Sequence, residues 1–274
     1  DVYKRQAFKY DISANLSTLK NKVTSLGFGT DSYITGAYAT YVGSEIGKFY
    51  GWVYEGIART QEDLDNHATQ GGANVGDCLY KDISGPNGEP DGVIDAYDQT
   101  VLGSGLPKVN FGLSTHMEYK GFDLNISTYG VLNYHVSDDI YNSLNSCYGW
   151  ANKDVAMGDA NRFAEDGTYI SNVPRTYATN NATLAWNDLF SSRKIQNAAY
   201  WKIANVELGY NFPNKWFGGY VSGVRLYVSA QNLYTFTGYH GYNVDYAGGT
   251  FTPGYNFCSF PSARTFMAGL HFTF

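Results

Sequence analysis

The clearest chemical pattern in the sequence is a group of aspartates between positions 82 and 98. Asp82, Asp91, Asp95 and Asp98 alternate with glycines, which is typical of loops whose oxygens surround Ca²⁺. The spacing is interrupted, because residues 86–90 intervene and would pull Asp82 away from the others. Two hypotheses stay open: Asp91, Asp95 and Asp98 bind calcium, or the segment is a solvated turn whose aspartates cap their own backbone.

No spacing in the chain predicts catalysis. The sequence contains no HExxH, GxSxG, P-loop or dinucleotide-binding glycine pattern. The carboxylates of Asp138 and Asp139 are adjacent, so in a strand they would point to opposite faces. We expect His116 and His271 to line a polar face rather than to bind a metal. The chain is therefore predicted not to be an enzyme, and calcium is the one cofactor hypothesis.

Tyrosines and tryptophans are frequent in the segments that we expect to be loops. Such rings offer rigid amphipathic surface for stacking on sugars or on an ordered peptide. The alternative is that each ring packs the loops onto one another, so only the group predicts a binding surface. The candidates for contact with a ligand are Tyr134, Tyr141, Tyr148, Trp150, Trp186, Tyr239 and Tyr242, together with Tyr169 and Tyr177.

Composition indicates a protein made of strands and turns. Of 274 residues, 17% are aromatic and 16% charged, and the chain has 31 glycines. Aromatic residues suit a pleated, half-buried surface, and glycine suits tight turns. The net charge of −6 argues against a nucleic-acid partner, which requires a concentrated basic face, and the sequence contains no such basic stripe. Three widely spaced cysteines form no disulfide framework, although a single disulfide remains open.

Apolar and polar residues alternate with a period of two in seven segments, which predicts strands with two different faces. The segments are 8–20, 111–119, 122–129, 203–212, 224–231, 266–274 and, as the weakest, 47–58. The final segment shows the pattern best: Phe266, Leu270 and Phe272 share one face, with Met267 and His271 opposite.

Long and short connections alternate between these strands. Residues 59–107, 135–198 and 236–263 are long, whereas 120–121 and 213–222 are short. Outer-membrane barrels have short periplasmic turns and long extracellular loops, and soluble domains seldom carry such long loops. Residues 20–46 do not fit, because this order places them on the periplasmic side although they are too long for a turn; an extra hairpin within 33–41 stays open.

Charges and aromatics favour lipid on the apolar face. Acidic and basic residues gather on the polar face, and on the apolar face we place only Lys20 and Lys202, near strand ends where a lysine reaches the headgroups. A soluble β-sandwich also has one apolar face. Aromatic strand ends favour the membrane, because rings form interfacial girdles; these are Phe111, Tyr119, Tyr210, Phe212, Phe272 and Phe274.

Several segments, in order, closely resemble the C-terminal part of SusC/RagA-type TonB-dependent outer-membrane transporters. The matching segments are NKVTSLG (21–27), GSEIGKFYGWVYEGI (43–57), YKDISGPNGEPDGVIDAYDQTVLG (80–103), LPKVNFGLSTHMEYKGFDLNISTYG (106–130), VPR (173–175), YWKIANVELGYNFP (200–213), VRLYVSAQNLYTFTGYHGYNVD (224–245) and residues 260–266. The terminal strand also resembles the outer-membrane assembly signal, with Gly269, Phe272 and Phe274 at matching spacing, although Met267 stands where that signal usually has a polar residue.

The resemblance implies a fold, partners and a location. It implies an all-β protein, part of a larger antiparallel transmembrane β-barrel with long extracellular loops, in the outer membrane of a Gram-negative bacterium. The implied partners are a SusD-like lipoprotein, the TonB complex acting through an N-terminal region with a plug domain that is missing here, and the barrel assembly machinery. A barrel of this type has about 22 strands, so seven are about a third of its wall.

We therefore expect nutrient import of oligosaccharides or peptides, with residues 7–274 as wall and loops. Residues 1–6, DVYKRQ, resemble the translation of a sequencing adaptor, so we predict an artefact there. The alternatives are a small self-contained outer-membrane porin or adhesin barrel, and a secreted carbohydrate-binding β-sandwich.

Overall fold

The computed structural model describes residues 8–147, 152–176, 186–218, 221–246 and 248–274, so the predicted adaptor at 1–6 lies outside the described residues. The strands are β1 (Phe8–Thr18), β2 (Ser32–Thr35), β3 (Tyr38–Tyr41), β4 (Lys48–Gly51), β5 (Tyr54–Ile57), β6 (Cys78–Tyr80), β7 (Thr100–Ser104), β8 (Val109–Tyr119), β9 (Phe122–Leu132), β10 (His135–Asp138), β11 (Gln196–Asn197), β12 (Tyr200–Asn211), β13 (Gly223–Thr237), β14 (Tyr255–Asn256) and β15 (Thr265–Thr273). The two short α-helices are α1 (Gln61–Asp65) and α2 (Asp139–Leu144). No helix among the described residues is long and apolar enough to cross a membrane.

Six long strands form one antiparallel sheet in the order β1-β8-β9-β12-β13-β15, which we call the wall. Two short connections join neighbouring strands at one end, which we call the turn end. One of them is the two-residue turn Lys120–Gly121, where both residues have positive φ (49° and 91°). That backbone twist matches the twist of the flanking strands, so Tyr119 and Phe122 pair directly.

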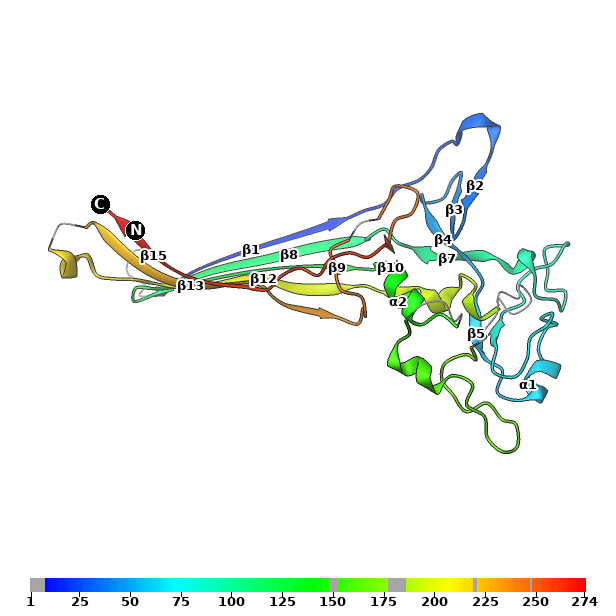
Figure 1. Ribbon diagram of the computed structural model, residues 1–274. Coiled ribbons are helices and arrows are strands. Elements are labelled where there is room, and N and C mark those ends of the chain that lie inside the picture. The colour runs from blue at the N-terminus through cyan, green and yellow to red at the C-terminus, as the bar shows by residue number, and fades with distance from the viewer. Residues whose placement is uncertain (1–7, 148–151, 177–185, 219–220, 247) are drawn as a thin grey trace.

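Three long connections leave the opposite end of the wall, the loop end (Figure 1). The first loop spans residues 19–108, the second 133–199 and the third 238–264. Figure 1 shows β2 to β7, α1 and α2 gathered beyond that end of the sheet. The predicted separation of long and short connections is therefore confirmed.

The prediction that residues 47–58 cross the membrane is wrong. They form β4 and β5 within the first loop, and β1 pairs directly with β8 from Phe8↔Tyr119 to Thr18↔Val109. Aromatic residues lie on both sides of this segment because it packs inside the loop region, where Phe49 is fully buried. With this strand removed from the wall, residues 20–46 lie at the loop end, and their length needs no special explanation.

Small sheets order the first loop. β2 and β3 form the hairpin that the sequence left open within 33–41, and they continue into β4 and β7 as a four-stranded sheet. A core cluster of Cys78, Tyr80 and Ile94 packs against Trp52 from the same loop and Trp186 from the second. A second cluster joins the wall to the other two loops; it contains Val131, Tyr134, Val136, Ala198, Tyr200, Tyr239 and Val244.

Candidate binding surface at the loop end

One face of the wall is apolar across all six strands. The register aligns, strand by strand, Ile12, Thr115, Ile126, Val206, Ala230 and Phe266 in one row. Side chains on this face are exposed, including Tyr10 (67%), Leu16 (71%) and Phe266 (69%). A soluble β-sandwich would bury such a face against a second sheet. An apolar face that stays exposed is instead compatible with contact with lipid.

Aromatic rings mark both ends of the apolar face. At the loop end Trp201 stacks on Phe236 with ring centroids 5.4 Å apart. At the turn end Phe122 lies against Tyr210 with centroids 4.6 Å apart. Two aromatic bands separated by aliphatic side chains are typical of the two interfaces of a membrane.

The opposite face of the wall carries the charges, as the sequence predicts. Arg225 donates hydrogen bonds to Asp123 (3.0 Å from Nε) and to Glu207 (2.6 Å). A Cβ at position 209 would lie 2.5 Å from the Asp123 carboxylate. The glycine at this position therefore leaves room for Asp123 and Arg225 beside the backbone. These groups satisfy one another's hydrogen bonds, and with two carboxylates for one guanidinium the cluster keeps a net negative charge.

Lys202 is on the polar face, which contradicts the prediction that its charge reaches lipid headgroups. The register shifts between Ile203 and Asn205, so Ala204 is the extra residue of a β-bulge. A bulge reverses which side chains face out, and the expected alternation fails beyond it. Lys202 is therefore 3% exposed and pairs with Asp245 of the third loop at 2.5 Å.

The Asp245 carboxylate is held by three donors. Besides Lys202, the hydroxyl of Tyr200 donates to it at 2.8 Å, and the hydroxyl of Tyr129 at 3.1 Å. These donors come from β9 and β12, whereas Asp245 is more than 40 residues downstream of Lys202. This ion pair fixes the third loop to the polar face of the wall, and we call it the Asp245 clamp.

A buried polar cluster joins the second and third loops. Asp138 accepts hydrogen bonds from the Tyr239 hydroxyl and from Asn256 Nδ2 (2.9 Å), and both acid and amide are almost fully buried. β10 and β14 pair in parallel beside this cluster. Burial raises the pKa of Tyr239, so its hydroxyl keeps the proton that it donates to Asp138.

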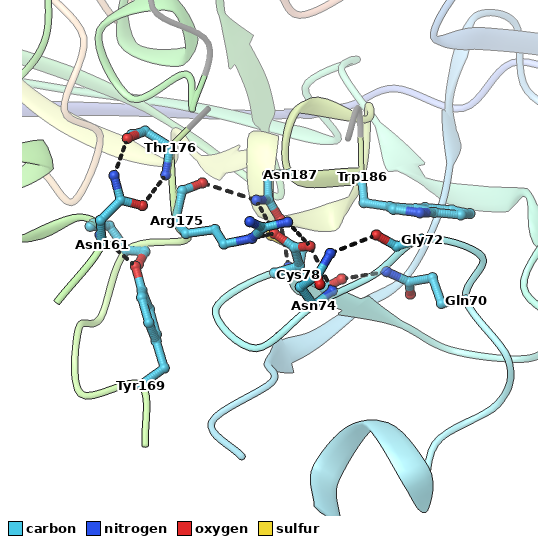
Figure 2. A network of polar contacts seen from close by, with 12 residues as sticks. Gln70, Gly72, Asn74, Cys78, Asn161, Tyr169, Arg175, Thr176, Trp186 and Asn187 are labelled. Atoms are coloured by element: carbon cyan, nitrogen blue, oxygen red, sulfur yellow. Dashed lines mark hydrogen bonds and ion pairs between the residues drawn. The ribbon is translucent and has the colours of Figure 1, made fainter. Parts of the chain in front are cut away.

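A second buried cluster joins the first and second loops (Figure 2). Arg175 donates to both oxygens of Asp77, at 2.5 Å from Nε and 2.9 Å from Nη2. Asn187 donates to the same carboxylate at 2.8 Å and accepts the Cys78 backbone N–H at 2.6 Å. Removing one partner of such a buried pair leaves an uncompensated charge, so the two loops depend on one another.

The predicted loop aromatics divide between packing and exposure. Tyr134 and Tyr239 are buried in the apolar cluster that joins the wall to the second and third loops, and Tyr169 is fully buried. Tyr141 is half-buried and stacks on His240, while Trp186 donates its indole N–H to the Gly71 carbonyl at 2.8 Å. Tyr242 is 63% exposed. Tyr148, Trp150 and Tyr177 lie outside the described residues.

The acidic segment caps its own backbone. The fully buried Asp98 carboxylate accepts N–H groups from Ile83 (2.7 Å), Ser84 (3.1 Å) and Asp95 (2.9 Å). Asp91 accepts the N–H of Val93 at 3.0 Å. Within the described ranges, no group of three or more acids, histidines or cysteines is arranged to hold a metal ion.

The remaining predicted residues lie on the last strand and among the cysteines. Gly269 faces Tyr227 across β13 and β15, and a Cβ there would lie 2.6 Å from the tyrosine ring, so glycine makes room for that ring. Phe272 and Phe274 are exposed at the end of the chain, and Phe272 pairs with Val224 of β13. Cys78, Cys147 and Cys258 are free. Burial raises the pKa of Cys78 and of Cys147 to about 12, so both stay protonated and unreactive.

Comparison with known proteins shows which proteins this chain resembles. It is 30% identical, over 98% of its length, to TonB-dependent receptor P3 of Formosa agariphila, and 24% identical, over 97%, to TonB-dependent receptor SusC of Bacteroides thetaiotaomicron. The chain is therefore similar, over nearly its whole length, to proteins named TonB-dependent receptors. No family model matches it. The chain spans about a quarter of the length of those relatives, 27% of P3 and 24% of SusC.

Solved structures share the fold of this chain. The RagAB peptide transporter superposes over 99% of the chain with a TM-score of 0.76 at 21% identity, and its closed-closed state gives 0.75. The wall is accordingly a section of a transmembrane β-barrel, with β1 and β15 as the edges of the described sheet. Because the relatives are receptors and not enzymes, the prediction that the chain is not an enzyme is confirmed.

Sequence reasoning missed the charged residues that organise the loop end. Asp77, Arg175 and Asp245 are isolated charges far apart in the sequence, without a motif that predicts their contacts. A signal was present for Lys202 alone, since a lysine on an apolar face is anomalous.

Proposed function

We propose that the protein containing this chain imports oligosaccharides or peptides across the outer membrane of a Gram-negative bacterium, with energy from the TonB complex. The observation that carries the proposal is the similarity of nearly the whole chain to TonB-dependent receptors, SusC among them. One solved protein with this fold is named a peptide transporter. In this proposal the chain supplies wall and substrate-facing loops.

The loop end supports the proposal because its three loops are fixed in place. The Asp245 clamp, the Asp138 cluster and the Asp77–Arg175 pair join wall and loops through buried polar contacts. A preorganised surface loses little entropy when it binds a ligand. A SusD-like lipoprotein would cover this end, and the barrel assembly machinery would insert the strands, recognising the terminal strand with Gly269, Phe272 and Phe274.

Uptake by intact cells tests the proposal. Cells that carry the complete gene are given a mixture of oligosaccharides and peptides, and depletion from the medium is followed by mass spectrometry. We expect specific compounds to disappear only when both this gene and the gene for TonB are present. Uptake that persists without TonB would instead support the self-contained porin, and pull-down of the receptor tests for a lipoprotein partner.

A further inference from the structure

A pocket lies where β13 extends beyond β15. The first residue of β15, Thr265, pairs with Gln231, but β13 continues to Thr237. The third loop folds against this unpaired stretch and leaves a pocket of about 350 Å³. Its lining includes Tyr242, Asn243, Ser262 and Arg264 from the loop segment and Lys202 from the wall. This volume is in the range of small-ligand sites.

The pocket carries one uncompensated positive charge. The Lys202 ammonium is neutralised by Asp245 at 2.5 Å, and the remaining capacity of that carboxylate is used by the hydroxyls of Tyr200 and Tyr129. Arg264 is exposed, and it has no hydrogen bond or ion pair with any other residue that the structure describes. Its guanidinium is therefore available to an anion from outside the chain.

The backbone around Arg264 is held on both sides. Asn232 donates from Nδ2 to the Ala263 carbonyl at 2.9 Å, and Thr265 begins the ladder with Gln231. The Asp245 clamp fixes the loop residues that form the other side of the pocket, next to the exposed ring of Tyr242. The backbone segments that carry a charged guanidinium and a flat ring are thus held around one cavity.

We propose that this pocket binds a carboxylate group of the imported ligand, with Arg264 as the ion-pair partner and Tyr242 as the stacking surface. The planar guanidinium donates two parallel hydrogen bonds to a carboxylate, a match that an uncharged ligand cannot make. The inference rests on the proposed import function. The carboxylate has two candidate sources, the C-terminus of a peptide and a uronic acid in an oligosaccharide.

Binding to the purified, intact receptor tests the pocket with four probes. These are pentaalanine with a free C-terminus, pentaalanine amide, trigalacturonate and its methyl ester. We expect one acid to bind more tightly than its neutral counterpart, and that acid identifies the source. Arg264→Gln should weaken acid binding about tenfold or more, the size of a charged hydrogen bond, and leave the neutral probe unchanged. Arg264→Lys should retain part of the preference.

A matched control is Arg162→Gln, which removes another exposed arginine, paired with Asp159 in the second loop; acid binding should not change. Equal binding of acid and neutral probes, no binding of any probe, or equal weakening of both forms by Arg264→Gln would each overturn the pocket. TonB-dependent uptake together with equal binding of acid and neutral probes would contradict the carboxylate-binding pocket and leave the import proposal standing. Acid-selective binding without TonB-dependent uptake overturns import alone.

Discussion

Gly241 lies where a side chain has no space, between the third loop and the Asp138 cluster. A Cβ there would lie 2.5 Å from Asp138 Oδ2 and would also overlap the ring of Tyr239. Gly241→Ala should therefore separate the second and third loops at a cost of about 1–3 kcal/mol, typical of overpacking. Limited proteolysis of the intact protein should show faster cleavage in these loops. Gly238→Ala is the control, because a Cβ at 238 meets nothing within 4 Å; equal cleavage of both variants would contradict the account.

The Asp98 carboxylate caps the backbone of its own segment, because its two oxygens accept three N–H groups. Asp98→Asn should lower the temperature of thermal unfolding of the intact protein, because one amide cannot accept all three bonds and the cost of unpaired buried N–H groups is about 1–3 kcal/mol. Adding calcium or EGTA should leave the unfolding temperature of the native protein unchanged. A calcium-dependent rise that Asp98→Asn abolishes would support the calcium hypothesis instead.

The strands of the wall could be predicted from the alternation of apolar and polar residues, but the β-bulge in β12 could not. β1, β8, β9, β13 and β15 keep the faces that the sequence indicates along their paired lengths. In β12 the extra residue Ala204 reverses the pattern at Lys202, and no local signal distinguishes this alanine. The prediction of a wall strand at residues 47–58 failed for a different reason. Their short strands β4 and β5 pair with β3, β7 and β6, and these pairings have no local sequence signal.

The two faces of β9 provide a matched pair of variants. Ile126 faces outward in the middle of the apolar row, and its neighbour Ser127 faces the polar side opposite Asn205. Ile126→Lys should destabilise the protein in lipid by about 2–4 kcal/mol, the cost of a cation at the bilayer midplane, while Ser127→Lys should be tolerated. Urea unfolding of the intact protein in lipid vesicles measures both. Tolerance of Ile126→Lys would mean that this face does not meet lipid.

At the scale of the whole molecule, the wall and the loops have different surfaces. The wall offers an apolar belt to lipid and, on the other side, a polar face whose charges are paired with one another by Arg225. The loops hold the exposed Tyr242 and Arg264 on a base fixed by buried ion pairs and hydrogen bonds. The sequence predicted the belt and the loop end, whereas the contacts between the loops join residues about 100 positions apart and leave no periodic trace.

Labelling of single cysteines on living cells tests this orientation. In the complete protein with Cys258→Ser, which removes the exposed native thiol, Val155→Cys places a thiol in the second loop at a position that is 94% exposed. Lys215→Cys places one in the turn-end connection. A membrane-impermeant maleimide should label Val155→Cys on intact cells, and Lys215→Cys only after the outer membrane is permeabilised. Labelling of Lys215→Cys on intact cells, with Val155→Cys protected, would contradict a wall that spans the outer membrane with its loops outside.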